Sequence, residues 1–259
     1  MTKSVEEFEK VQQLIAEGLN DCAVARDTGI PRTTVRDWRR RPPRRLSHPS
    51  DPLSCGVVHD FDSLHAASYA YLLGMYLGDG CISKASRTYT LRVTCDKRYP
   101  TIIARCRLAI DALFPRQRAG VYWRRSGCAD VYQCSKHWPC LLPQHGPGRK
   151  HLRKIALEPW QQKIVDGETE EFVMGLIHSD GCRVVANDRG VLSVRYHFSN
   201  RSEDIIGLFT AALDHLGITW RRSDKHTVSI YRKAATARMD EFIGPKDLAV
   251  PLNGVHYTT

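Results

Sequence analysis

The chain contains one ten-residue pattern twice, and this repetition limits the possible fold more than any other feature. Residues 71–80 and 172–181 are both apolar runs that end in Asp-Gly. The small residues in these runs stand four positions apart, as Gly74 and Gly78 in the first and as Gly175 and Ser179 in the second. Residues at this spacing share one helix face, and a face without large side chains lets a second backbone approach closely. The sequence therefore predicts two helices packed on each other.

Each predicted helix ends in a carboxylate. Asp79 and Asp180 would lie at helix C-termini, where the partial negative charge disfavours an acid. Bringing the two ends together adds repulsion between like charges. We expect Gly80 and Gly181 to be ordinary glycines that turn the chain out of the helix. Taken singly, each Asp-Gly pair is typical of an exposed turn. Repetition of the whole pattern instead favours a divalent-cation site, because such ions take hard oxygen ligands.

The two runs resemble the signature motif of the LAGLIDADG homing endonucleases, in the form that carries two motifs in one chain. The match spans residues 72–80 and 173–181, and the resemblance extends over residues 65–245, most of the chain. The sequence departs from the motif at its earlier Asp, which is replaced by Leu77 in the first run and by His178 in the second.

The resemblance implies a metal-dependent DNA endonuclease that uses Mg²⁺ or Mn²⁺. The implied metal ligands are Asp79, Asp180 and the backbone carbonyl groups of Gly78 and Ser179. The family also places a basic residue near each metal ion, and Lys225 fits this catalytic position in the second repeat. A plain surface lysine is the alternative. Cys128 occupies the corresponding position in the first repeat, which implies unequal cleavage of the two strands.

The duplication continues beyond the two motif helices. After each motif the sequence predicts two strands, a helix and two more strands, over residues 81–84, 89–96, 100–114 and 120–136 and again over residues 182–186, 191–199, 202–216 and 218–231. The block Trp-Arg-Arg-Ser also occurs in both halves, at residues 123–126 and 220–223. The predicted fold class is α+β, with two pseudo-symmetric αββαββα repeats over residues 65–148 and 149–259 that form a DNA-binding saddle. The second range includes the linker between the repeats.

The predicted strands alternate between apolar and polar residues. The apolar set of residues 191–199 comprises Leu192, Val194, Tyr196 and Phe198, which we expect to face the helices. The opposite faces of the sheets are rich in basic and hydrogen-bonding groups, although one polar face is routine for an antiparallel sheet. The candidate DNA contacts on these faces are Arg92, Arg124, Arg125, Arg195, His197, Arg221 and Arg222.

Residues 1–41 form a separate predicted module of three helices. Gly29 makes a tight turn after the second helix, and Pro31 stands where the third would begin. This order resembles a helix-turn-helix unit, with Val35 and Trp38 as core anchors. A small bundle for protein contacts is the alternative. The candidate base-contacting residues near the start of the third helix are Arg32, Thr33, Thr34 and Arg36.

Residues 42–64 read as a basic, proline-rich linker. Arg44 and Arg45 follow two prolines that hold the chain extended, and such an arm can contact phosphates or a narrow minor groove. The alternative is a merely solvated linker.

The composition indicates which class of partner the protein binds and in which compartment it works. The 259-residue chain has a formal net charge of +10, which favours double-stranded DNA or another polyanion. Nine cysteines without a Cys-x-x-Cys pair, together with a charged N-terminus, indicate reduced thiols and a cytoplasmic, nucleoid-associated protein. No apolar run has membrane-spanning length. We expect a monomer with internal pseudo-two-fold symmetry.

Three functions are compatible with these features. The first is a divalent-metal-dependent double-strand endonuclease of the homing type, which the retention of both aspartates favours. The second is a transcription regulator that combines a helix-turn-helix with a LAGLIDADG scaffold and has weak or no cleavage activity. The third, an RNA-splicing maturase on the same scaffold, has less support.

Overall fold

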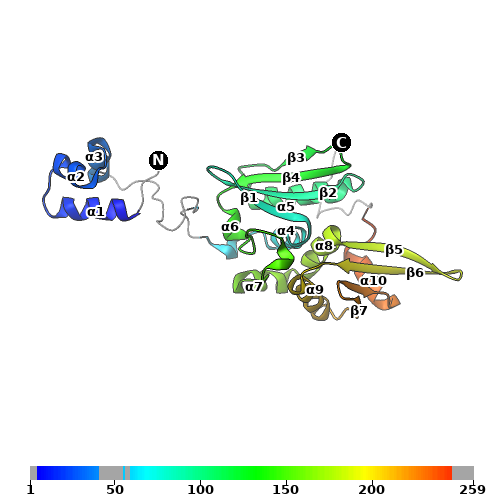
Figure 1. Ribbon diagram of the computed structural model, residues 1–259. Helices are drawn as coiled ribbons and strands as arrows, with labels where there is room; N and C mark the ends of the chain where they lie inside the picture. The colour runs from blue at the N-terminus through cyan, green and yellow to red at the C-terminus, as the bar shows by residue number, and fades with distance from the viewer. Residues whose placement is uncertain (1–4, 41–54, 56–58, 247–259) are drawn as a thin grey trace. The chain divides into compact units, whose positions relative to one another are not determined.

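The computed structural model describes residues 5–40, 55 and 59–246, and the chain divides into two compact units, Met1–His59 and Asp60–Thr259 (Figure 1). The helices of the first unit are α1 (Val5–Ala16), α2 (Asp21–Thr28) and α3 (Arg32–Arg40). The side chain of Asn20 accepts hydrogen bonds from two backbone N–H groups at the start of α2. Gly29 ends α2 with a φ of 69°, a conformation that glycine adopts without steric cost. Three helices therefore form where the sequence predicts them.

An apolar core holds the three helices of the first unit together. Its buried members are Val11, Val24, Ile30, Val35 and Trp38, which confirms the two predicted anchors of α3. Arg32, Thr33 and Arg36 are exposed on α3, and Thr34 is half-buried. The predicted contacts Arg44 and Arg45 lie outside the described residues.

The second unit contains two four-stranded antiparallel sheets with the same strand order. The first sheet has the order β1-β2-β4-β3 and the second β5-β6-β8-β7. The strands are β1 (Gly80–Lys84), β2 (Tyr89–Asp96), β3 (Gly120–Trp123), β4 (Cys128–Ser135), β5 (Gly181–Asp188), β6 (Val191–Ser199), β7 (Arg221–Asp224) and β8 (Thr227–Ile230). The predicted α+β class and the duplicated order of strands are confirmed.

The helices of the second unit also repeat. Each half has a motif helix, a helix between its strand pairs and a final helix, which are α4 (Ala66–Asp79), α5 (Pro100–Leu113) and α6 (Trp138–Leu141), then α8 (Thr169–Asp180), α9 (Glu203–His215) and α10 (Lys233–Phe242). Between the halves lie the short η2 (Lys150–Leu152) and α7 (Pro159–Gly167), for which the sequence predicts no helix, and η1 (Phe61–Ser63) precedes α4. Among the described helices, none is both long and apolar enough to cross a membrane.

The motif helices α4 and α8 pack directly on each other, as their small residues predict (Figure 1). A Cβ atom added at Gly74 would lie 2.5 Å from the carbonyl oxygen of Phe172. One added at Gly175 would lie 2.3 Å from the carbonyl oxygen of Tyr71. Because both distances are well below van der Waals contact, only glycine permits this approach of the two backbones.

The glycines after the two acids have a different role from the one that the sequence suggests. Gly80 and Gly181 have φ values of −85° and −107°, which are extended conformations open to any residue. An added Cβ at Gly80 would instead lie 2.5 Å from the Cα atom of Tyr76. At Gly181 it would lie 2.8 Å from the Cα atom of Ile177. These glycines are needed because each strand begins against the last turn of its helix.

The strand faces follow the predicted alternation in the first sheet and only partly in the second. Burial alternates along the whole of β2. On β6, Tyr196 and Phe198 are buried, but Leu192 is 69% exposed. The prediction that Leu192 faces the helices is therefore wrong. The outer part of the β5–β6 hairpin extends beyond the helices that cover its inner part (Figure 1).

Candidate functional site

The packing of α4 on α8 brings the two repeated acids together at one end of the helix pair. Asp79 and Asp180 are the last residues of these helices. A Cβ added at Gly78 would lie 3.2 Å from Cγ of Asp180, so the two ends are in close contact. Burial, followed by the charge of Asp180, raises the pKa of Asp79 to about 6. Burial also raises the pKa of Asp180, against the effect of a hydrogen bond from Asn200.

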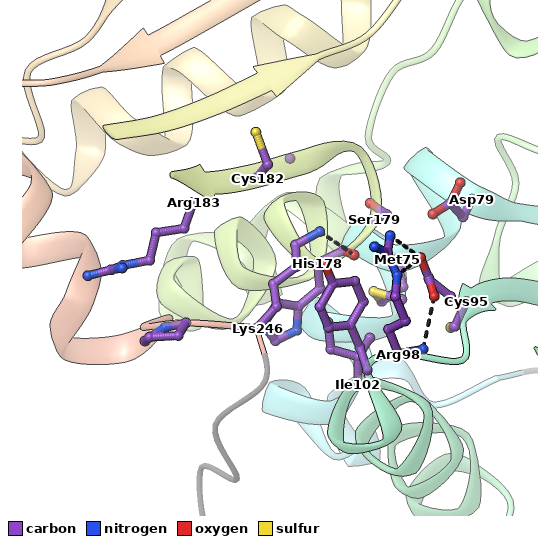
Figure 2. Close-up of a pocket in the computed structure, with 14 residues that line it drawn as sticks. Met75, Asp79, Cys95, Arg98, Ile102, His178, Ser179, Cys182, Arg183 and Lys246 are labelled. Atoms are coloured by element: carbon purple, nitrogen blue, oxygen red, sulfur yellow. Dashed lines mark hydrogen bonds and ion pairs between the residues drawn. The ribbon is translucent and has the colours of Figure 1, made fainter. Parts of the chain in front are cut away.

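Asp79 lines a cavity of about 670 Å³ to which α4, β2, the end of α8 and the start of β5 all contribute (Figure 2). Ser179, the residue before the other acid, lines the same cavity. Lys246 also lines it, and its Nζ donates a hydrogen bond of 3.1 Å to the carbonyl oxygen of His178. This cavity therefore combines an acid of the first repeat with the helix end of the second.

Asp180 lines a smaller cavity of about 370 Å³ with the reciprocal composition. Here the residue before the other acid is Gly78, and the lysine is Lys150. The two cavities thus use corresponding residues of the two halves. Each contains one motif carboxylate, the penultimate residue of the opposite motif helix and one lysine.

Lys150 closes the C-terminal end of α4. It lies in η2, and its Nζ donates hydrogen bonds to the carbonyl oxygens of Leu77 at 2.9 Å and Gly78 at 2.7 Å, as well as to that of Tyr76. Carbonyl groups in the last turn of a helix have no partner within the helix, and a cation there opposes the negative end of the dipole. Burial lowers the pKa of Lys150 to about 8, against the effect of Asp180 and Asp79.

The two acidic sites differ in their hydrogen bonding. Nδ2 of Asn200 donates a hydrogen bond of 2.6 Å to Oδ2 of Asp180. Gly80 pairs with Val93 in the first sheet, and Gly181 pairs with Phe198 in the second. Asn200 lies two residues after Phe198, so its equivalent in the first repeat is Cys95, two residues after Val93. Cys95 lines the cavity of Asp79. An amide that donates to a carboxylate favours its ionised form, so the geometry stabilises Asp180 more than Asp79.

Lys225, the predicted catalytic lysine, is not among the described residues that line the cavity of either acid. It is exposed between β7 and β8, and its backbone carbonyl accepts a hydrogen bond from Arg222. The neighbouring His226, rather than Lys225, lines the cavity of Asp180. The lysines that contact the motif helix ends are Lys150 and Lys246. No local pattern marks either of them, because each comes from a segment far along the chain from the helix that it caps.

The predicted DNA contacts on the sheets divide into paired and exposed groups. Arg92 and Arg124 both form ion pairs with Asp130 in the first sheet. In the second sheet, Arg195 pairs with Asp188, Arg222 pairs with Glu203, and Nδ1 of His197 lies 2.7 Å from Oγ of Ser229. Arg125 and Arg221 are exposed.

The donor atoms at the paired helix ends fit a hard divalent cation. The exposed carboxylate of Asp79 and the half-buried one of Asp180 are close together, and the raised pKa of each shows that its ionised form is disfavoured without a bound cation. The carbonyl oxygen of Gly78 lies in the cavity of Asp180 but is hydrogen-bonded to Lys150. A metal ion in that cavity would therefore compete with the ammonium group for this ligand.

Substituting Lys150 with Met should destabilise the protein by about 2–4 kcal/mol, because three helix-end carbonyls lose their donor and the acids lose a cation. Chemical denaturation monitored by circular dichroism measures the change. Lys163→Met is the matched control, since Lys163 pairs with Asp62 at an exposed position and should change stability by no more than about 0.5 kcal/mol. Equal losses in the two variants would contradict a structural role of Lys150 at the helix end.

No protein-family model matches the chain, and no curated protein matches it in sequence. Solved structures with a similar arrangement include mesophilic variants of the homing endonuclease I-DmoI, with a TM-score of 0.46 and 16% identity over 69% of this chain and 96% of that one. The homing endonuclease I-WcaI, bound to its DNA recognition sequence, has a TM-score of 0.46 and 11% identity over 71% of this chain and 84% of that one.

The N-terminal LAGLIDADG domain of DUF199/WhiA is similar to a comparable degree. It has a TM-score of 0.43 and 13% identity over 73% of this chain and 84% of that one. At such low identities and TM-scores, these similarities do not assign a function to the chain.

Proposed function

We propose that this protein is a divalent-metal-dependent endonuclease that cleaves both strands of duplex DNA, of the LAGLIDADG homing type. The observation that carries the proposal is the reciprocal pair of acidic cavities at the end of α4 and α8. Each holds one motif carboxylate and the penultimate residue of the opposite helix. A structural role alone does not account for two carboxylates, one exposed and one half-buried, that meet at negative helix ends.

The proposed metal ligands are Asp79 with the carbonyl group of Ser179 in one cavity, and Asp180 with the carbonyl group of Gly78 in the other. When bound, Mg²⁺ or Mn²⁺ would activate a water molecule and neutralise the charge that develops on the phosphate. The helix pair fixes the two carboxylates relative to each other, so that one compact site can serve both strands. Lys150 and Lys246 hold positive charge beside the acids and are placed to attract the DNA backbone.

Binding of the duplex is proposed to use the polar faces of the two sheets. These faces carry the exposed Arg221 and the acid-paired Arg92, Arg124 and Arg195. Arg125 lies in the turn between β3 and β4, and Arg222 is in register with Val228 and Phe198 on the helix-covered side. The net charge of +10 supports a polyanionic partner. Lys225 is proposed to act as a further basic residue of the catalytic site.

Incubation of the protein with Mn²⁺ or Mg²⁺ and a library of duplex DNA tests the enzymatic proposal directly. Metal-dependent double-strand breaks at a defined sequence are the expected result. Sequence-specific binding without any cleavage in either metal would contradict the proposal and favour a transcription regulator. That second function is supported by the two lysines, because Lys150 and Lys246 already supply cations at the acidic site.

The first unit is proposed to act as a helix-turn-helix in either case. Its α3 exposes Arg32, Thr33 and Arg36 near the start of the helix, while Val35 and Trp38 hold the opposite side in the core.

Replacing Arg32 and Arg36 together with Ala should weaken DNA binding and reduce the slope of log K against log salt by about 2, one unit for each lost phosphate contact. Titrations at several salt concentrations, followed by fluorescence anisotropy, measure this slope. Lys10→Ala on α1 is a control within the same unit, because Lys10 is paired with Asp27. An unchanged affinity of the double variant would mean that the first unit serves a different partner.

A further inference from the structure

The polar face of the first sheet contains an acid that is almost fully buried. Asp130 on β4 is only 4% exposed, although it lies on the face opposite the helix-covered side chains of β2. Oδ1 of Asp130 accepts a hydrogen bond of 2.8 Å from Oγ1 of Thr94. Oδ2 accepts one of 2.7 Å from Nε of Arg124 and forms a longer ion pair of 3.6 Å with Nε of Arg92. One carboxylate therefore orients two guanidinium groups.

Both arginines keep hydrogen-bond donors available. Arg124 contacts Asp130 through Nε and Nη2, and Arg92 approaches it through Nε. Within the described part of the chain, the remaining N–H groups at the ends of both side chains have no protein acceptor, and each side chain is 40% exposed. One arginine would suffice to neutralise the buried acid. The second leaves the cluster with a net positive charge.

Two tyrosines border this cluster and form a hollow of about 420 Å³ with it. Tyr122 is 62% exposed and Tyr132 is 39% exposed, so both rings are accessible to a ligand on this face. The ring of Tyr132 lies on Gly120, its partner on β3, where an added Cβ would come within 2.6 Å of the ring. The glycine thus holds one wall of the hollow in place.

We propose that Arg92, Arg124 and Asp130 form a reading site for guanine in the major groove, with Asp130 as the positioning residue. The proposal deepens the proposed function and rests on it. A guanidinium end offers two parallel N–H donors, and guanine is the base that presents two adjacent acceptors, O6 and N7, in the major groove. An arginine side chain that a carboxylate already holds in place loses less conformational freedom on binding than an unrestrained arginine does. The exposed tyrosines lie beside the arginines, within reach of neighbouring bases or sugars.

The second sheet does not repeat this site. With the two motif glycines superposed, the registers match Asp130 to Thr227, Thr94 to Ser199 and Arg92 to His197. Oγ of Ser199 lies 2.9 Å from Oγ1 of Thr227, so the polar contact remains without the acid. The preferred guanine is therefore expected in only one half of the DNA site, which makes the target asymmetric.

Selection of bound duplexes from a randomised library tests the proposal with the full-length protein in Ca²⁺, so that binding is read without cleavage. The wild type should select a G·C pair at one or two adjacent positions in one half-site. Arg124→Lys and Arg92→Lys keep the positive charge but lose the two parallel N–H donors of the guanidinium group. Each should reduce the preference for G at one of these positions by about tenfold. Asp130→Asn should reduce the preference for G at both positions. Arg222→Lys in the second sheet is the matched control and should leave these positions unchanged.

The selected duplex then provides a sharper test, because replacing the guanine with 7-deazaguanine removes only the N7 acceptor. Wild-type affinity should fall by about tenfold, whereas Arg124→Lys should bind both duplexes equally. Thermal melting of each variant shows whether it is folded. If Asp130→Asn does not fold, Arg124→Lys and Arg92→Lys still test the guanine site. Selective binding whose base preference is the same in all variants would overturn the guanine site and leave the proposed function intact. Absence of any DNA binding by the wild type would overturn both.

Discussion

Replacing Asp79 with Asn is expected to abolish metal-dependent cleavage and, in the same molecule, to stabilise the metal-free protein. The loss of activity follows from the proposed role of the carboxylate as a metal ligand. A metal ion contributes several kcal/mol to stabilising the charge of the transition state, so cleavage should slow by at least about a thousandfold. DNA affinity should change little, because the amide keeps the size of the side chain.

The gain in stability follows from the pKa of Asp79. Burial and the neighbouring Asp180 raise this pKa from 3.8 to about 6. Between pH 4 and pH 6 the folded state therefore binds more protons than the unfolded state, and the contribution of Asp79 to stability falls as pH rises through this window. Above pH 6 the ionised carboxylate destabilises the folded protein. Asn carries no such charge, so the variant should be more stable at pH 8 in EDTA. Because solvent screens the exposed carboxylate of Asp79, the gain should be no more than about 1 kcal/mol.

Denaturation of the wild type and Asp79→Asn in EDTA, at pH 5 and at pH 8, measures this difference. The gain should be larger at pH 8, where Asp79 is ionised. Asp62→Asn is a suitable control, because Asp62 is exposed and pairs with Lys163 at the surface. Asp180→Asn should also lose cleavage, with a smaller gain in stability because Asn200 already donates to Asp180. A variant that cleaves normally, or one that is less stable at pH 8, would contradict the assignment of Asp79 as a carboxylate kept for binding a cation.

The helix pair and its acids could be predicted from the sequence because their signals are local. The spacing of Gly74 and Gly175 within apolar runs indicates which helix faces meet, and Asp79 and Asp180 follow at fixed positions. Period-two alternation likewise located β2. It could not show that Leu192 lies beyond the helices, because alternation identifies a face but not the length over which that face is covered.

The groups that complete the site could not be predicted, because they come from distant segments without a motif. Lys150 reaches α4 from the segment between the repeats, and Lys246 reaches α8 from the end of the described chain. Asn200 contacts Asp180 only through the register of β5 and β6. A further asymmetry lies between Asn200 and Cys95, which occupy equivalent positions beside the two acids. The asymmetry expected from Lys225 and Cys128 stays a prediction.

Gly175→Ala and Gly207→Ala should change stability in opposite directions, although both replace a helical glycine with alanine. Gly207 lies on an exposed part of α9, and an added Cβ would meet nothing within 4 Å. Alanine has the higher helix propensity, so Gly207→Ala should stabilise the protein by about 0.5–1 kcal/mol. At Gly175, the added Cβ would lie 2.3 Å from the carbonyl oxygen of Tyr71 and 3.1 Å from the Cα atom of Gly74.

Both neighbours of Gly175 are backbone atoms, so the clash cannot be relieved by rotation of a side chain. The two helices must separate, and the loss of their close packing should exceed the gain in helix propensity and destabilise the protein by about 2–4 kcal/mol. Chemical denaturation of the two variants and the wild type measures the change in the free energy of unfolding for each variant, including its direction. If Gly175→Ala were as stable as Gly207→Ala, α4 and α8 could not be in backbone contact. Because the same contact holds Asp79 and Asp180 together, Gly175→Ala should also weaken divalent-cation binding under conditions where the variant remains folded, whereas Gly207→Ala should leave it unchanged.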